Sequence, residues 1–531
     1  MTYHSAFDAA RGNDLTWWRR PGLWAVTSAA LVLLANSSGI AVGDDGIGYR
    51  AIADRMTTGR GLGYFLEPHL TIWPPGWPAL MALVSKLTGL DAEHAAVLLN
   101  ALTAAATVLL VDRLVRRVTR REGFQFAMVL VAAVGTSTML FGHLLMTDFS
   151  FAAITLAGLL ALLNYRDQRD LVWLGLAIVL VWAGFMVRYA GVVNIAIGAL
   201  WLLNDRSADL RGRVLQAAGF AGGSALVPAA WVLRNIETDG TLMGLRYSSN
   251  RGLLANAGDM VATVGNFVLP GVASERRGLW LVVAAVGIAT MSVAMWRAVL
   301  RWPGAHSLKG LANRLDSASG LLTLHVAVFA AYMLYARTTT GLNRLDFRLL
   351  HPMYLPLCLI AIALLSRMSY RPNGLDGRRW GLLSFLLTYG WAALNIVVGL
   401  VMVGYFATAP DLFVGNYERP AFHAVRASPA LQSIPRDCPT GSNLPNALYG
   451  SGVEAQWSPR RTGLESDDKV DDLARLDRHL ANGPYCLVWI DLPPRYGHLV
   501  SLSALRHRYR LDEVSHDRAL TVYRVFPRVR G

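Results

Sequence analysis

The chain has 531 residues, of which 53% are hydrophobic and only 16% are charged. Soluble globular domains carry about 25% charged residues, so this composition excludes a string of water-soluble domains, a coiled coil, a disordered tail protein and a disulfide scaffold. The net charge of +14 would suit a nucleic-acid-binding protein, but all basic residues except three lysines are arginines, and most of these sit in short clusters between apolar runs. That arrangement is typical of membrane proteins.

Eleven apolar runs are long enough, or nearly so, to cross a bilayer as helices. The first run is too long for the apolar part of a signal peptide and no small-residue cleavage site follows it, so it is expected to remain as an anchor. We therefore predict an all-α polytopic membrane domain over residues 1–404. The runs are centred in 22–41, 93–112, 124–142, 149–164, 171–187, 190–204, 214–233, 279–300, 318–336, 349–366 and 380–404.

Six arginine clusters fall on one side of the membrane, provided that the segment 74–90 does not span it. That segment begins with two prolines and contains Lys86, so we expect it to lie at the outer interface. The N-terminus is then expected to be cytoplasmic. The segments expected to face outward are the loop 42–92, the loop 235–278, the loop 337–348 and everything after about 405.

Residues 405–531 differ in character, because apolar runs shorten and acidic residues become frequent. We predict a small extracytoplasmic α/β domain with a helix over 466–481 and strands over 486–492 and 520–526. Cys438 and Cys486 both lie in this part, where a disulfide is their natural pairing. Two unpaired buried thiols are the competing interpretation.

Acidic residues mark the outer side of the membrane domain. Asp44 and Asp45 follow the first apolar run directly, and Asp148 lies at the outward end of a hairpin, with His143 nearby. Each aspartate could simply cap the helix that follows it. Two carboxylates facing one outer cavity would instead suit a general base acting on a hydroxyl, or a cation or proton path in a transporter.

Arginine is unexpected in short outer loops, yet Arg234, Arg246, Arg344 and Arg348 lie in or beside them. Guanidinium groups hold phosphate oxygens well. The alternatives are salt bridges, for instance with Asp346, and binding to anionic headgroups. Arg188 and Tyr189 end a helix on the same side, where an anion site would recruit them.

An aromatic loop completes this outer face, with Tyr64, Phe65, Trp73 and Trp77. Carboxylates beside guanidinium groups at an aromatic membrane interface fit a substrate with a phosphate headgroup and a lipid tail. In that reading an acid deprotonates an acceptor, and arginines stabilise the lipid phosphate that leaves.

The order of these features resembles the GT-C superfamily of integral-membrane glycosyltransferases, in particular the branch with protein O-mannosyltransferases and the lipid A aminoarabinose transferase. The resemblance covers most of the chain. The segments that carry it are DxxxY at 45–49, WPPGWPALMAL at 73–83, the MTDFSFAAI hairpin, WVLRN at 231–235, DFRLLHP at 346–352 and SNLP at 442–445.

The resemblance implies a polyprenyl-phosphate-linked sugar donor, an outward active site and inversion at the anomeric carbon. It makes Asp45 the catalytic base, with Asp44 as a second candidate, and matches Asp148 to the acid of the hairpin. Arg348 matches the arginine that binds the leaving phosphate, although His351 is inserted before the proline here.

Further substrate contacts are expected on the same grounds. His69 would replace a basic residue that some relatives carry near the WPP segment, and Tyr49 and Trp73 belong to the matched motifs. We expect no cofactor and no metal, with a divalent cation at the Asp44–Asp45 pair as the alternative.

We therefore expect a glycosyltransferase, hexosyl or pentosyl, acting on a glycan, lipid or protein acceptor. A bias toward arginine over lysine suggests a GC-rich bacterial genome, which favours a cell-envelope arabinosyl- or mannosyltransferase. The alternatives are a proton- or cation-coupled transporter or lipid flippase using the same carboxylates, and an envelope scaffold. The sequence shows no internal repeat of the kind common in transporters.

Overall fold

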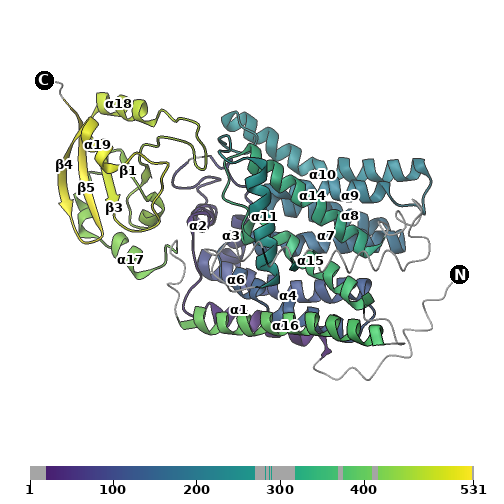
Figure 1. The fold of residues 1–531 in the computed structure, drawn as a ribbon. Coiled ribbons are helices and arrows are strands. Elements are labelled where there is room, and N and C mark those ends of the chain that lie inside the picture. Colours follow the sequence, from purple (N-terminus) through teal and green to yellow (C-terminus); the bar gives the residue numbers. More distant parts are fainter. Residues whose placement is uncertain are drawn as a thin grey trace.

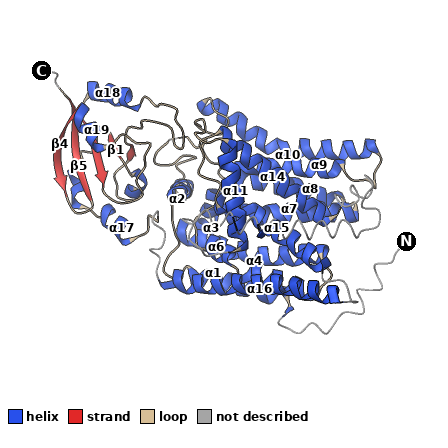
Figure 2. Cartoon of the chain, viewed as in Figure 1, coloured by secondary structure: helices blue, strands red, loops and turns tan. Residues whose placement is uncertain are grey.

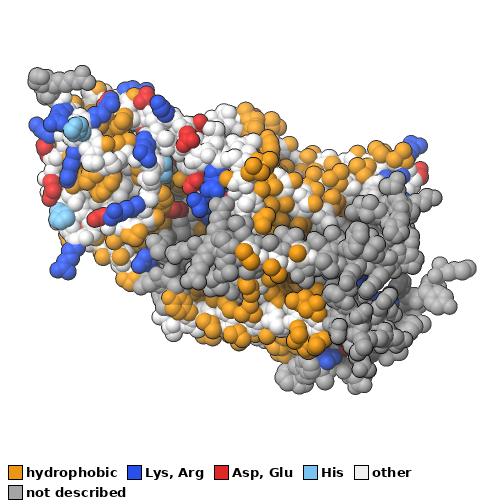
Figure 3. Space-filling model, viewed as in Figure 1, with side chains coloured by type: hydrophobic (Ala, Val, Ile, Leu, Met, Phe, Trp, Pro, Cys, Tyr) orange, Lys and Arg blue, Asp and Glu red, His pale blue; other side chains and the backbone are white. Residues whose placement is uncertain are grey.

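The computed structural model describes residues 19–67, 69–269, 317–368, 375–408 and 416–528, together with the single positions 282, 286, 287 and 289. A bundle of helices is followed by a smaller domain that holds all the strands drawn (Figures 1 and 2). Apolar side chains cover much of the visible bundle surface, whereas charged side chains gather on the smaller domain (Figure 3). This contrast fits a bundle in lipid and a domain in water.

Seven helical segments in the described part of the chain are long and apolar enough to cross a membrane. Three shorter apolar helices accompany them. Together they account for ten of the eleven predicted spans, and the run 279–300 lies outside the described residues except for the four single positions 282, 286, 287 and 289. The long ones are α4 (Ala92–Val118), α5 (Glu122–Val134) with α6 (Thr136–Gly142), α7 (Asp148–Gln168), α10 (Leu210–Asp239), α14 (Ala318–Thr339), α15 (Phe347–Met368) and α16 (Leu375–Thr408), and the short ones are α1 (Pro21–Ala35), α8 (Leu171–Val187) and α9 (Val193–Leu203).

Two helices form the first loop between α1 and α4. Helix α2 (Asp44–Thr57) follows Gly43, which is extended, and has two aspartates in its first turn, where the helix dipole favours negative charge. Helix α3 (Gly76–Thr88) starts after Pro75 and ends at Gly89, whose φ of 76° suits glycine. Both segments were expected to be helical at the outer interface.

Helix α11 (Leu253–Val268) lies where the sequence predicted only a loop over 235–278. Its buried residues include Met260 and Phe267, which belong to the main core of the bundle. The segment is amphipathic rather than uniformly apolar, and a search for spanning runs passes over such helices. The segment 235–278, predicted as a connection between spans, therefore contains a packed helix that the sequence pattern did not predict.

The C-terminal domain contains a five-stranded sheet in the order β2-β1-β3-β5-β4. Strand β1 is parallel to β2 and β3, and β5 is antiparallel to β3 and β4. The strands are β1 (Thr440–Ser442), β2 (Ala455–Trp457), β3 (Tyr485–Ile490), β4 (Tyr509–His516) and β5 (Leu520–Pro527), and the helices are α17 (Pro420–Arg426), α18 (Asp472–Asn482) and α19 (Leu502–Arg508), with short 3₁₀ turns at Tyr189–Val192, Pro429–Ser433 and Pro445–Leu448.

The predicted strands coincide with β3 and β5, and the predicted helix with α18, which begins later because Asp471 caps it by accepting a hydrogen bond from the Ala474 amide. A disulfide joins Cys438 to Cys486, whose Cα atoms lie 5.9 Å apart. Cys358 is a buried thiol in α15.

The C-terminal domain and the first loop share one hydrophobic cluster. Ile47 of α2, Trp77 of α3 and Leu145 are buried together with Tyr417 and Leu444 of the C-terminal domain. Figure 1 shows α2 between the bundle and this domain. The two parts are therefore packed together at the end of the bundle where α2 and α3 lie.

Candidate active site

Four charged side chains form a continuous chain of ion pairs at the end of the bundle near α2. Asp45 pairs with Arg348, and the Nε atom of Arg348 lies 3.3 Å from Oδ2 of Asp148. The other oxygen of Asp148 pairs with Arg188. Residues separated by up to 303 positions in the sequence are thus brought together, and carboxylates alternate with guanidinium groups.

The local structure explains these positions. Asp45 and Asp148 lie in the first turns of α2 and α7, where carboxylates interact favourably with the helix dipole. Arg348 lies in the first turn of α15, where a cation is disfavoured, and its two carboxylate partners offset that cost. Arg188 ends α8 in an extended conformation.

The two carboxylates differ in their access to solvent. The side chain of Asp148 is 1% exposed, whereas that of Asp45 is 27% exposed. Asp45 is therefore the one of the two carboxylates that a molecule entering from solvent can reach. Asp148 is placed to hold both arginines.

The His351 ring lies between the Asp148 backbone and the Ser137 side chain. Its Nδ1 lies 3.3 Å from the backbone oxygen of Asp148, and its Nε2 lies 2.8 Å from the Ser137 hydroxyl. The ring is buried and packs on Phe141 at a centroid distance of 3.9 Å. His351, which stands before Pro352 in the DFRLLHP segment, thus contacts the backbone of Asp148.

Asp44 faces the opposite way from Asp45. Its carboxylate accepts hydrogen bonds from the Tyr417 hydroxyl at 2.6 Å, from the Asn446 amide at 2.7 Å and from the Tyr496 hydroxyl. All three donors belong to the C-terminal domain. Burial and the charge of Asp44 raise the pKa of Tyr496 and of Tyr417, so both phenols remain protonated donors.

Tyr49 and Trp73 form an aromatic wall next to Asp45. Their ring centroids lie 5.4 Å apart, and Trp73 also contacts Tyr64 at 5.4 Å. Burial and the charge of Asp45 raise the pKa of Tyr49. The phenol is therefore a neutral neighbour of the carboxylate.

Three predicted substrate-binding residues contact the first loop. The Tyr189 hydroxyl donates to the Thr71 carbonyl at 2.6 Å, Arg234 donates to the Leu70 carbonyl, and Arg246 donates to the Ile72 carbonyl at 3.0 Å. These contacts hold the segment 70–72, which leads to Trp73.

The other predicted residues have different surroundings. His143 is buried, hydrogen-bonds Asn36 at 3.0 Å and stacks on Phe406. His69 and Arg344 are exposed. No three His, Cys, Asp or Glu side chains gather into a possible metal site within the described ranges.

Sequence reasoning missed Tyr417, Asn446, Tyr496 and Thr147. Asn446 follows the SNLP stretch directly, which was a usable signal. The Thr147 hydroxyl accepts a hydrogen bond from Arg188 at 3.4 Å, and this residue directly precedes the hairpin acid in the sequence. Nothing in the local pattern singled out the two tyrosines.

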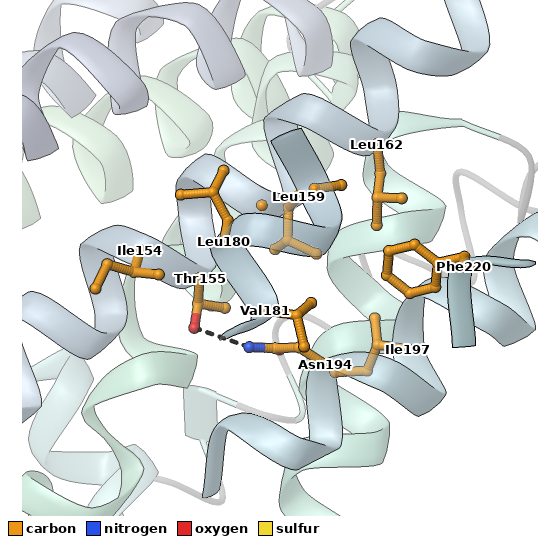
Figure 4. Close-up of a pocket in the computed structure, with 11 residues that line it drawn as sticks. Ile154, Thr155, Leu159, Leu162, Leu180, Val181, Asn194, Ile197 and Phe220 are labelled. Carbon is orange, nitrogen blue, oxygen red and sulfur yellow. Dashed lines mark hydrogen bonds between the residues drawn. The ribbon is translucent and has the colours of Figure 1, made fainter. Parts of the chain in front are cut away.

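A narrow apolar crevice lies deeper in the bundle and is distinct from this cluster. It is lined by residues of α7, α8, α9 and α10, and the Asn194 amide points to the Thr155 hydroxyl at 3.3 Å (Figure 4). Thr155 lies about two helical turns beyond Asp148. The crevice contains no charged side chain.

Comparisons with known proteins identify the architecture. The family model described as dolichyl-phosphate-mannose-protein mannosyltransferase matches residues 73–231. ArnT from Cupriavidus metallidurans in the apo state superimposes with a TM-score of 0.57 at 14% identity, covering 94% of this chain and 97% of that one. This chain has the GT-C fold. Among curated proteins, none matches its sequence.

Two further structures with the GT-C fold are similar. ArnT from the same organism bound to undecaprenyl phosphate gives a TM-score of 0.56 at 14% identity, with 94% of this chain and 97% of that chain covered. The oligosaccharyltransferase from Archaeoglobus fulgidus in complex with Zn and sulfate gives 0.50 at 12% identity, with 88% and 68% covered.

The two kinds of comparison cover the ion-pair chain differently. The family model spans Asp148 and Arg188 but not Asp45 or Arg348. The ArnT superposition covers 94% of this chain and so extends far beyond the segment that the family model matches.

Proposed function

We propose that this protein is a membrane glycosyltransferase that moves a sugar from a polyprenyl-phosphate donor to an acceptor hydroxyl with inversion. The observation that carries the proposal is the chain Asp45–Arg348–Asp148–Arg188, set at the end of an apolar bundle. It offers a base and an anion site in contact with each other. The similarity to ArnT, which has been solved with undecaprenyl phosphate bound, supports a donor of this class.

In this mechanism Asp45 takes the proton from the acceptor hydroxyl as its oxygen attacks the anomeric carbon of the sugar. The new carbon–oxygen bond forms as the bond to the phosphate oxygen breaks, and the electron pair leaves with polyprenyl phosphate. Attack from the face opposite to the leaving group inverts the configuration at that carbon. A positioned base contributes typically a factor of 10²–10⁴.

Arg348 and Arg188 stabilise the phosphate that leaves. Arginine binds phosphate through several donors in a fixed plane, and a site with little water strengthens that contact. When phosphate arrives, Arg348 exchanges its bond to Asp45 for bonds to the phosphate. This exchange releases the carboxylate of Asp45 to act as a base.

Asp44 is a positioning residue in this proposal. Its oxygens are already occupied by three donors of the C-terminal domain, and they fix the start of α2. The Asp45 carboxylate is then directed toward Arg348. The acceptor class and the sugar depend on contacts in the loaded site.

The proposal places the reaction on the outer face of a bacterial inner membrane, as the arginine distribution indicates. It divides the chain into a catalytic membrane domain, residues 1–404, and an extracytoplasmic domain, residues 405–531. Helix α16 extends to Thr408, so this boundary falls in its last turn.

The test compares two neighbouring aspartates. Asp45→Asn is expected to reduce sugar transfer by about 10² or more, because the amide cannot accept the proton. Asp44→Asn is the matched control, since it retains a carbonyl oxygen for the tyrosines, and it is expected to lose stability more than chemistry. Transfer from a polyprenyl-phosphate sugar and thermal unfolding are measured on both. Full transfer by Asp45→Asn would refute its role as the base.

A further inference from the structure

The C-terminal domain has a cavity that the transfer reaction does not use. It has a volume of about 210 Å³, smaller than the roughly 300–1,000 Å³ of sites that enclose a drug-sized ligand, so it can hold only a small part of a ligand. Its wall is formed by the start of the parallel strands, by the first turns of α18 and by Phe65 of the first loop. It therefore lies where the two domains meet.

The side chains that line the cavity are aromatic and polar. Trp457 and Phe65 are half-buried and give flat apolar surfaces. Glu454, Gln456 and His479 are exposed at the cavity and present acceptors and donors of hydrogen bonds. A flat apolar surface beside planar polar groups matches a saccharide, whose rings have a C–H face and an edge of hydroxyls.

The charge of the cavity argues against an anionic ligand. Asp472 accepts hydrogen bonds from Arg460, through Nε at 2.7 Å, and lies 3.5 Å from Arg475. Its charge is thus balanced by arginines that already have a carboxylate partner. Glu454 adds a negative charge at the rim. A neutral, hydroxyl-rich ligand suits this balance better than a phosphate does.

Contacts connect the cavity to the proposed active site by two routes. Trp457 packs edge-on against Tyr496, with centroids 5.3 Å apart, and Tyr496 donates to Asp44. On the other side Phe65 contacts Tyr64 at 5.8 Å, and Tyr64 contacts Trp73 at 5.4 Å. Both routes end at α2, so a ligand in the cavity sits against elements that hold Asp45.

We propose that this cavity binds a neutral saccharide portion of the acceptor and holds it above the membrane site. This inference rests on the proposed transfer reaction, which gives the cavity an acceptor to hold. The saccharide stacks on Trp457 and hydrogen-bonds Gln456 and His479. The cavity therefore sets acceptor affinity and takes no part in the chemistry.

The test measures saccharide binding by saturation-transfer NMR on the full chain in detergent. The probes are a mannose trisaccharide, an arabinofuranose trisaccharide and a serine-containing hexapeptide. Gln456→Ala/His479→Ala is the test variant. Gln432→Ala/His507→Ala is its matched control, because both residues are exposed in the same domain and do not line the cavity.

We expect at least one trisaccharide to bind, the test variant to weaken it by about tenfold or more, and the control to leave it unchanged. Asp45→Asn should still bind the trisaccharide although it no longer transfers sugar. A failure of the proposed transfer reaction can therefore be distinguished from a failure of the proposed saccharide binding. Absence of trisaccharide binding, or equal binding by the test variant, would overturn the inference. The inference would also be overturned if the hexapeptide bound to the native chain and to the control variant but not to the test variant.

Discussion

Arg348 connects the proposed base to the proposed phosphate site, because it contacts both Asp45 and Asp148. A lysine at this position keeps the charge but contacts only one partner at a time, without the planar fork. We expect Arg348→Lys to lower the transfer rate by about 10²-fold, as removal of one oxyanion donor does. Arg367→Lys, at the other end of α15, is the control and should transfer normally. Initial transfer rates at saturating donor are measured for both variants and the native chain. A rate of Arg348→Lys equal to the native rate would exclude Arg348 from the phosphate site.

His498 gives the C-terminal domain a pH dependence. Burial, with the nearby Arg460 and Arg461, lowers the pKa of His498 to about 4, against about 6.5 in an unfolded chain. As the pH falls, the unfolded chain takes up the proton first, so the folded state loses stability between about pH 6.5 and 4 and is unaffected above that window. Because the imidazole is partly exposed, solvent screening reduces this loss to on the order of 2 kcal/mol.

His498→Phe is therefore expected to reduce the fall in melting temperature between about pH 7 and pH 4.5. The exposed His507 provides the control, His507→Phe, which should retain the full decrease. Melting temperatures of the full chain at both pH values give the result. Identical pH dependence in His498→Phe and the native chain would contradict this assignment.

At the same scale, the sequence suggested which charged residues matter but not how they pair. Asp45, Asp148 and Arg348 were all expected at one outer site, because motif and topology place them on one side. The partners of Asp44 lie 373, 402 and 452 positions away. No local spacing reports contacts at such separations, so the motif could favour Asp45 but could not show that Asp44 contacts the C-terminal domain.

At the scale of elements, the first loop depends on a close approach between α2 and the Trp73 segment. A Cβ atom added at Gly48 would lie 2.6 Å from Cη2 and Cζ3 of Trp73. Gly48→Ala therefore forces the indole away from Tyr49, at a cost of about 1–3 kcal/mol. We expect a lower melting temperature and slower transfer.

Gly219→Ala is the control for this change, because an added Cβ in α10 meets nothing within 4 Å. It should leave both quantities unchanged or raise the stability slightly through helix propensity. Differential scanning fluorimetry and initial rates test the pair. A Gly48→Ala protein as stable and active as the control would show that this contact does not shape the site.

Elements with a strong periodic or apolar pattern were predictable, and elements defined by packing were not. The long spans and strands β3 and β5 follow from runs of apolar residues. Helix α11 mixes Asn256 and Asp259 with apolar residues and is stabilised by its contacts with the bundle. The short strands β1 and β2 have three residues each, too few for periodicity to show.

For the whole molecule, the C-terminal domain is fixed to the membrane domain on two sides. Asp44 and its three donors form one attachment. On the other side Asp468 accepts from the Ser248 hydroxyl at 2.6 Å, and buried Arg337 pairs with Glu465 at 3.3 Å. The domain is thus held over the end of the bundle that carries the ion-pair chain. The contrast between an apolar bundle and a charged C-terminal domain was predictable from the composition of the two parts of the sequence.

The most direct test of glycosyl transfer uses the purified full chain in liposomes with polyprenyl-phosphate donors that carry arabinose, mannose or aminoarabinose, and with the mannose and arabinofuranose trisaccharides and the serine-containing hexapeptide as acceptors. The quantity measured is free polyprenyl phosphate released over time, beside the movement of intact donor across the bilayer. We predict that one donor is cleaved, and that Asp45→Asn cleaves it about 10²-fold more slowly. Movement of intact donor without cleavage would contradict the account and favour a flippase.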